Sequence, residues 1–241
     1  MKKLYQRHEL IFAILWIVLY VNVFSLADRL SRSLGVEKLV TFPAAAIMCI
    51  FLFLWLRRQG LMKKYGLCAP EVKARDALYY LPLALIVSCN AWFGLRLNMS
   101  WGETALYVLS MLCVGFLEEL IFRGFLFRAM SREGLKSAII VSSISFGIGH
   151  IVNLFNGSGA ELLPTLLQVC YAVAAGYMFV ILFYKCGSLI PCIAAHSGIN
   201  MLSAFGVEPG NAGRIFSAAA LCVISLGYAL YLNKKTGGKL Q

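Results

Sequence analysis

Eight long apolar runs alternate with short polar segments along the chain. Each run is about as long as the roughly 20 residues that an α-helix needs to cross a bilayer. Runs this long and this continuously apolar suit helices better than barrel strands, since backbone groups in lipid must bond to one another. The pattern predicts an all-α fold, a polytopic membrane helix bundle with about eight transmembrane helices. The runs cover 10–26, 39–56, 77–95, 104–127, 138–156, 162–184, 188–206 and 215–232.

Composition supports this class. Of the 241 residues, 60% are hydrophobic and 14% are charged, whereas an ordinary soluble domain is roughly 25% charged. The runs take up most of the chain and leave only short loops, so we expect a single integral membrane domain over residues 1–241, with the lipid bilayer as one partner. Nucleic-acid binding is a poor fit.

The net charge of +11 is unevenly distributed. If the amino terminus is cytoplasmic, sixteen of the 22 basic residues fall in inner segments and five in outer loops. Cytoplasmic loops are the richer in Lys and Arg, so we expect a multi-pass protein of the cell membrane with both termini in the cytoplasm. The inner residues are Lys2, Lys3, Arg7, Arg57, Arg58, Lys63, Lys64, Lys73, Arg75, Arg128, Arg132, Lys136, Lys185, Lys234, Lys235 and Lys239, and the outer ones are Arg29, Arg32, Lys38, Arg96 and Arg214.

Few ionisable groups lie inside the runs. The charged ones are Glu118, Glu119 and Arg123, all in the fourth run, and two of the three histidines, His150 and His196, lie in the fifth and seventh. Charges at membrane depth cost several kcal/mol and mark function by default. Counted from the inner ends of their runs at about 1.5 Å per residue, Glu118, His196 and His150 lie roughly 15, 16 and 21 Å deep. Groups on three helices therefore share one level.

Spacing within the fourth run separates the two glutamates. Glu119 and Arg123 are i,i+4 neighbours and face each other on one side of a helix. Their pairing lowers the cost of both charges in lipid. Glu118 lies about 100° further round the helix, so its carboxylate is free to point elsewhere.

The same i,i+4 spacing recurs in two other runs, as Phe146 with His150 and as His196 with Asn200. A carboxylate and an imidazole that share a proton with water can act as general base and then as general acid. His196 and Asn200 can donate hydrogen bonds to a developing oxyanion. This chemistry favours a hydrolase that acts on a carbonyl, most simply a peptide bond.

Together these residues resemble the CPBP family, the CAAX-protease and bacteriocin-processing membrane proteins that include the type II CAAX prenyl endopeptidases. The family pattern is E-E-x-x-x-R, F-x-x-x-H and H-x-x-x-N on three helices. Here it reads Glu118-Glu119-x-x-x-Arg123, Phe146-x-x-x-His150 and His196-x-x-x-Asn200, and the sequence around Arg123 matches the bacterial type. The similarity covers about residues 104–206, the expected catalytic core.

The resemblance implies a glutamic intramembrane endopeptidase of a bacterial cell membrane that needs no metal or other cofactor. It implies that Glu118 activates water with His150, and that His196 and Asn200 stabilise the oxyanion. Glu119, Arg123 and Phe146 would support them. The implied partner is a peptide or protein substrate, CAAX-like or bacteriocin-like, which can be membrane-anchored or prenylated.

Two other classes stay open. A zinc protease could use the same glutamates and histidines as ligands, although H-E-x-x-H is absent and Arg123 beside the glutamates disfavours a cation. The eight cysteines form no C-x-x-C pair, so we expect neither a disulfide nor a zinc cluster. Alternatively, the protein is no enzyme but a transporter, or a membrane immunity or scaffold protein.

Overall fold

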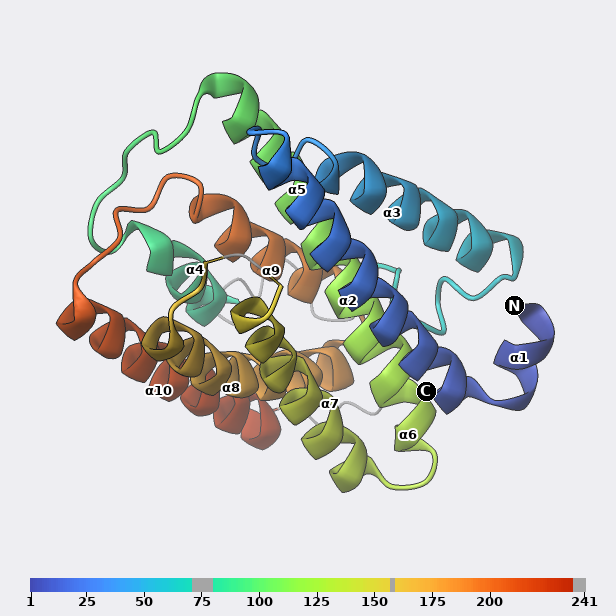
Figure 1. Cartoon of the computed structure of the whole chain (residues 1–241). Helices are drawn as coiled ribbons and strands as arrows, with labels where there is room; N and C mark the ends of the chain where they lie inside the picture. The colour runs from blue at the N-terminus through green and yellow to red at the C-terminus, as the bar shows by residue number, and fades with distance from the viewer. Residues whose placement is uncertain (71–79, 157–158, 236–241) are drawn as a thin grey trace.

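The chain folds into a bundle of helices (Figure 1). The computed structural model describes residues 1–70, 80–156 and 159–235. Two apolar helices, α2 and α3, are joined by a short turn, and the short elements α4 and η2 precede α5. The elements are α1 (Lys2–Arg7), α2 (Glu9–Ser33), α3 (Thr41–Arg58), α4 (Leu81–Val87), η2 (Ser88–Ala91), α5 (Trp101–Glu118), η3 (Glu119–Phe127), α6 (Arg128–Ser131), α7 (Leu135–Gly149), η4 (His150–Leu154), α8 (Leu162–Cys186), α9 (Ile190–Leu202) and α10 (Asn211–Lys235).

The predicted helical membrane bundle is confirmed, but the count of about eight spans is not. Within the described ranges, six helices are long and apolar enough to cross a membrane. The runs 77–95 and 188–206 instead yield the short helices Leu81–Ala91 and Ile190–Leu202. At about 1.5 Å per residue, the 13 residues of α9 fall short of a hydrocarbon core about 30 Å thick. Residues 77–79, and residues 71–76 of the loop 57–76, lie outside the described ranges.

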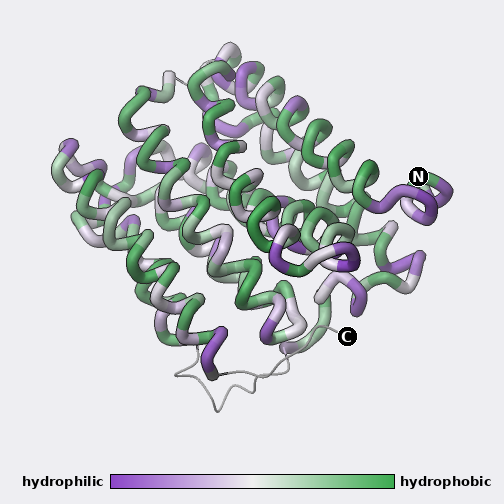
Figure 2. Tube along the Cα trace, turned by 90° about the horizontal axis from the view of Figure 1, so that it is seen from below, coloured by the Kyte–Doolittle hydropathy of each residue, from purple (hydrophilic) through white to green (hydrophobic). Residues whose placement is uncertain are grey.

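The surface of the bundle carries the apolar residues that a membrane would cover. Hydrophobic residues run along the helices, and hydrophilic ones gather at helix ends and connections (Figure 2). Ile47 on α3 and Val223 on α10 are 67% and 72% exposed. In lipid such side chains face acyl chains rather than water, so their exposure needs no partner protein.

Close approach of α5 and α9 brings the site together. A Cβ added at Gly115 would lie 2.1 Å from the Ser197 hydroxyl oxygen, so this crossing tolerates no side chain. Small residues allow membrane helices to pack at this distance. Because His196 adjoins Ser197, and Glu118 lies one turn after Gly115, the contact sets the imidazole beside the carboxylates.

Two backbone hydrogen bonds hold the segment that follows the C-terminal end of α9. The amide of Arg96 donates to the carbonyl of Phe205 at 2.7 Å, and the amide of Val207 donates to the carbonyl of Gly94 at 3.1 Å. The loop after η2 is thereby joined to the loop after α9. Nearby, the Ser100 side chain accepts from the amide of Glu103 and caps the start of α5.

Candidate active site

The helix that carries the two glutamates changes its winding between them. Helix α5 ends at Glu118, and the π-helical segment η3 begins at Glu119. A π-helix is rare in proteins and is frequently found at functional sites. In a regular helix the two side chains would point about 100° apart, which predicted different neighbours for them. Here both carboxylates lie close to the same imidazole on α9.

His196 bridges the glutamates through its two ring nitrogens. Its Nδ1 lies 2.8 Å from Oε1 of Glu119, and its Nε2 lies 3.4 Å from Oε2 of Glu118. The His196 side chain is only 7% exposed. The ring is stacked on Phe179 of α8 and meets Phe146 edge-on. Two charges and two aromatic rings therefore fix its orientation.

Arg123 lies in a fully closed part of the site. The side chains of Arg123 and Glu119 are both 0% exposed, and Nη1 of Arg123 is 3.1 Å from Oε1 of Glu119. The guanidinium carbon lies 4.1 Å from the centre of the Phe146 ring and 5.5 Å from that of Phe179. Aromatic faces attract a cation, so these rings replace water as its surroundings.

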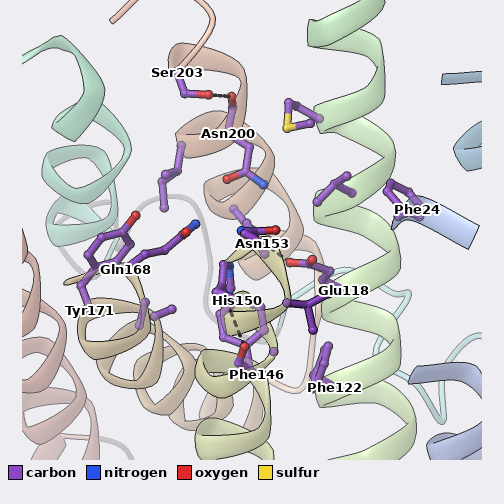
Figure 3. A pocket seen from close by; sticks show the side chains of 18 of the residues that line it. Phe24, Glu118, Phe122, Phe146, His150, Asn153, Gln168, Tyr171, Asn200 and Ser203 are labelled. Carbon is purple, nitrogen blue, oxygen red and sulfur yellow. Dashed lines mark hydrogen bonds and ion pairs between the residues drawn. The ribbon is translucent and has the colours of Figure 1, made fainter. Parts of the chain in front are cut away.

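Glu118, in contrast, lines a cavity of about 450 Å³. Its side chain is 14% exposed. Figure 3 shows Glu118 on α5 and His150 on η4 turned toward the same space, with Asn153 beside them and Asn200 on α9 further along. The carboxylate is thus accessible from the cavity, while Glu119, the next residue, is sealed.

A hydrogen bond to a backbone carbonyl indicates which ring nitrogen of His150 is the donor. Its Nδ1 lies 3.1 Å from the carbonyl oxygen of Phe146, and because a carbonyl only accepts, Nδ1 carries the proton. In the neutral ring Nε2 is then unprotonated and can accept a proton. Asn200 borders the same cavity, and its backbone carbonyl accepts a hydrogen bond from the Ser203 hydroxyl at 2.6 Å.

All residues singled out by the three motifs therefore meet around one imidazole and one cavity. The closed part holds Glu119, Arg123 and Phe146, and the cavity is bordered by Glu118, His150, His196 and Asn200, with Phe146 shared between the two.

Two residues of the site carry no sequence signal of their own. The hydroxyl of Tyr20, on α2, donates to Oε1 of Glu118 at 2.6 Å. Phe179 supports both His196 and Arg123. Each looks like an ordinary aromatic residue in an apolar run, and Tyr20 lies 98 positions from its partner, so spacing does not reveal either.

The fold and site define a polytopic membrane protein with an intramembrane Glu–His centre. Residues 100–202 match a family model described as type II CAAX prenyl endopeptidase Rce1-like. This match contains all three motifs, confirms the resemblance to the CAAX-protease family, and points to a protease. No curated protein and no solved structure matches the chain.

Proposed function

We propose that the protein is an intramembrane endopeptidase that hydrolyses a peptide bond with water activated by Glu118 and His150. One observation carries the proposal: Glu118 borders a cavity together with His150, His196 and Asn200, within a segment that matches a protease family. The proposed substrate is a peptide or protein of the CAAX-like or bacteriocin-like kind, which can be membrane-anchored or prenylated.

The contact between Nδ1 of His196 and Glu119 supports a proton on that nitrogen. Glu119 is paired with Arg123, and an ionised carboxylate only accepts. The Nδ1 atom of His196 therefore donates to Glu119. For Nε2 to donate to an oxyanion as well, the ring must be doubly protonated.

The reaction follows from these roles. Water binds between Glu118 and Nε2 of His150 and loses a proton to this pair as its oxygen attacks the carbonyl carbon. The oxyanion accepts from the Asn200 amide and from Nε2 of His196. When the intermediate collapses, the proton passes to the leaving amine, giving one carboxylic acid and one amine.

The test compares the membrane proteomes of cells that carry wild-type or Glu118→Gln protein. Glutamine keeps the shape of the side chain but accepts no proton, so a cleavage product should disappear while the amount of protein in the membrane stays the same. An unchanged set of products at normal abundance contradicts the proposal.

Arrangement of the charges also disfavours zinc as the catalyst. The Glu119 carboxylate is already engaged by a guanidinium, which would repel a divalent cation. Purified protein should therefore keep its activity after long treatment with a strong chelator. Loss of activity that added zinc restores would favour the metalloprotease instead. A non-catalytic immunity or scaffold protein would keep its function in the Glu118→Gln variant, and with a transporter no cleavage product would depend on the wild-type protein.

We propose further that both termini are cytoplasmic in a bacterial cell membrane. The sixteen-to-five split of basic residues supports this orientation. Reporter domains fused after Lys235 or inserted in the loop 57–76 should both report cytoplasm. An external signal from either fusion contradicts the orientation.

A further inference from the structure

Several side-chain amides in the apolar helices are bonded within the protein. The Asn90 amide in η2 donates to the carbonyl of Ile199 on α9 at 2.7 Å, and the Asn22 amide on α2 donates to the carbonyl of Val18 at 2.8 Å. Such bonds are a common role for an amide in a membrane helix, since the hydrocarbon offers no hydrogen-bond partner. An amide that lacks such a bond therefore needs another explanation.

Gln168 is an amide of this second kind. It is the one Asn or Gln side chain in α8, a helix of 25 residues that is mostly apolar. The side chain is half-buried and lines the cavity beside Glu118. Within residues 1–70, 80–156 and 159–235, its amide makes no hydrogen bond to the protein. The side-chain amide of Asn200, the candidate donor to the oxyanion, has no protein partner there either.

The position of Gln168 faces the catalytic groups. Tyr171 follows it by three residues, so the two side chains lie on neighbouring positions of one helix face, and both line the cavity. Figure 3 shows Gln168 and Tyr171 on the opposite side of the cavity from Glu118, with His150 between them. A molecule bound in the cavity therefore meets Glu118 on one side and the Gln168 amide on the other.

We infer that Gln168 binds the main chain of the substrate. A primary amide has both a donor and an acceptor, so it can accept from a peptide N–H and donate to a peptide carbonyl. The peptide groups of a helix are already paired with one another, which leaves them unable to bind Gln168. The substrate is therefore a segment that lies extended in the cavity. This inference rests on the proposed function, because it names the conformation and the binding contact of the substrate of that site.

The surroundings make this contact selective. Apolar side chains such as Ile86, Met111 and Leu221 also line the cavity, and hydrogen bonds are stronger in such surroundings than in bulk water. A site built to bond an N–H rejects an analogue that lacks it, because the buried polar group of the site is then left unpaired. Proline has no N–H, so we expect the substrate position opposite Gln168 to exclude proline.

A change of one side chain gives the first test. The variant is Gln168→Met, which keeps an unbranched side chain of similar size without its hydrogen bonds, and Gln6→Met on the exposed face of α1 is the matched control. The probe is a quenched fluorescent peptide that spans the cleavage site lost in the Glu118→Gln variant. For Gln168→Met, KM should rise by about 5- to 10-fold, the scale of one lost hydrogen bond. The value of kcat should stay within a few-fold of wild type, since removal of uniform binding changes KM alone. Gln6→Met should match wild type in both.

A change in the substrate gives the second test and needs no variant to succeed in wild type. A series of probe peptides each has one main-chain N–H replaced by an ester oxygen, at every position except the scissile bond. One ester should raise KM for the wild-type protein by about the same factor as Gln168→Met does. The same ester should have no further effect on Gln168→Met, because two changes that remove one contact are not additive. A structural role for Gln168 would not produce this coupling.

The outcomes separate this inference from the proposed hydrolysis. If wild type cleaves the probe and Gln168→Met has unchanged kinetic constants, or a loss in kcat alone, the inference is overturned and hydrolysis stands. Additive effects of every ester and Gln168→Met overturn it as well. Lower thermal stability of both Gln168→Met and Gln168→Leu would make the amide a structural group, with the same consequence. If no cleavage product depends on Glu118, the proposed function fails and this inference fails with it.

Discussion

The site has a closed half and an open half. Two adjacent glutamates of one continuous helix lie one in each half. Glu119 is fully buried against Arg123, whereas Glu118 borders the cavity. His196 contacts both carboxylates and joins the halves. The two identical side chains thus meet different surroundings. We expect changes in the open half to remove activity alone, and changes in the closed half to reduce stability as well.

We expect the largest difference between loss of activity and loss of stability at His150. His150→Ala removes a proton acceptor at the cavity, so the rate of peptide cleavage should fall by roughly 10²–10⁴-fold, the range of lost general-base catalysis. Its thermal stability in detergent should stay within a few degrees of wild type. The exposed His8 provides the control, since His8→Ala should change neither quantity. A His150→Ala protein of clearly lower thermal stability would assign this histidine to the closed half.

Arg123 is the corresponding probe of the closed half. Arg123→Met removes the guanidinium that is paired with the buried Glu119 carboxylate, and removing one partner of a buried pair typically costs about 3–5 kcal/mol. Abundance in the membrane and thermal stability should both fall. The double variant Glu119→Gln, Arg123→Met removes both charges, so it should recover much of the stability. No recovery would show that the guanidinium acts mainly through its aromatic contacts.

Asn200 should lose less activity than His150. Asn200→Ala removes one candidate donor to the oxyanion, which is worth about 10²–10³-fold in kcat. Expression should not change, and neither should KM if the amide acts mainly in the transition state. Asn22→Ala, on the exposed side of α2, is the matched control. A rise in KM alone would make Asn200 a substrate-binding group.

Tyr20 sharpens the comparison with a smaller effect, because it acts through Glu118. Tyr20→Phe removes only the hydroxyl that donates to the carboxylate. Hydrogen bonds to charged groups are worth about 1.5–3 kcal/mol, so kcat/KM should fall by roughly 10- to 100-fold. Tyr5→Phe is the control, because the Tyr5 hydroxyl binds Lys64 at the other end of the bundle. Equal losses in both variants would indicate a general packing effect.

Much of the closed half could be predicted from the sequence, because its groups are near neighbours or share a rare chemistry. Glu119 and Arg123 are four residues apart, and charges within apolar runs are conspicuous. For the open half, the similar depth of Glu118, His150 and His196 follows from counting residues along helices. The contact of Tyr20 with Glu118 joins α2 to α5 through packing alone, and no local pattern encodes such a partner.

The π-helical winding of η3 and the length of α9 could not be predicted from the sequence either. A π-helical turn depends on what packs around it, and here the segment lies entirely among buried residues. Hydropathy measures the length of an apolar run and not that of a helix. Helix α9 ends at Leu202, but the apolar run 188–206 continues into the following loop. In that loop Gly206 pairs with Leu95 through a β-bridge.

The central claim is that two adjacent glutamates serve opposite purposes, and one measurement addresses it most directly. Glu118→Gln and Glu119→Gln proteins are purified in parallel, and peptide cleavage and thermal unfolding are measured on the same samples. Glu118→Gln should lose roughly 10²–10⁴-fold in cleavage rate and unfold at the wild-type temperature, whereas Glu119→Gln should unfold at a clearly lower temperature. An active Glu118→Gln protein, or a Glu119→Gln protein as stable as wild type, would contradict this division.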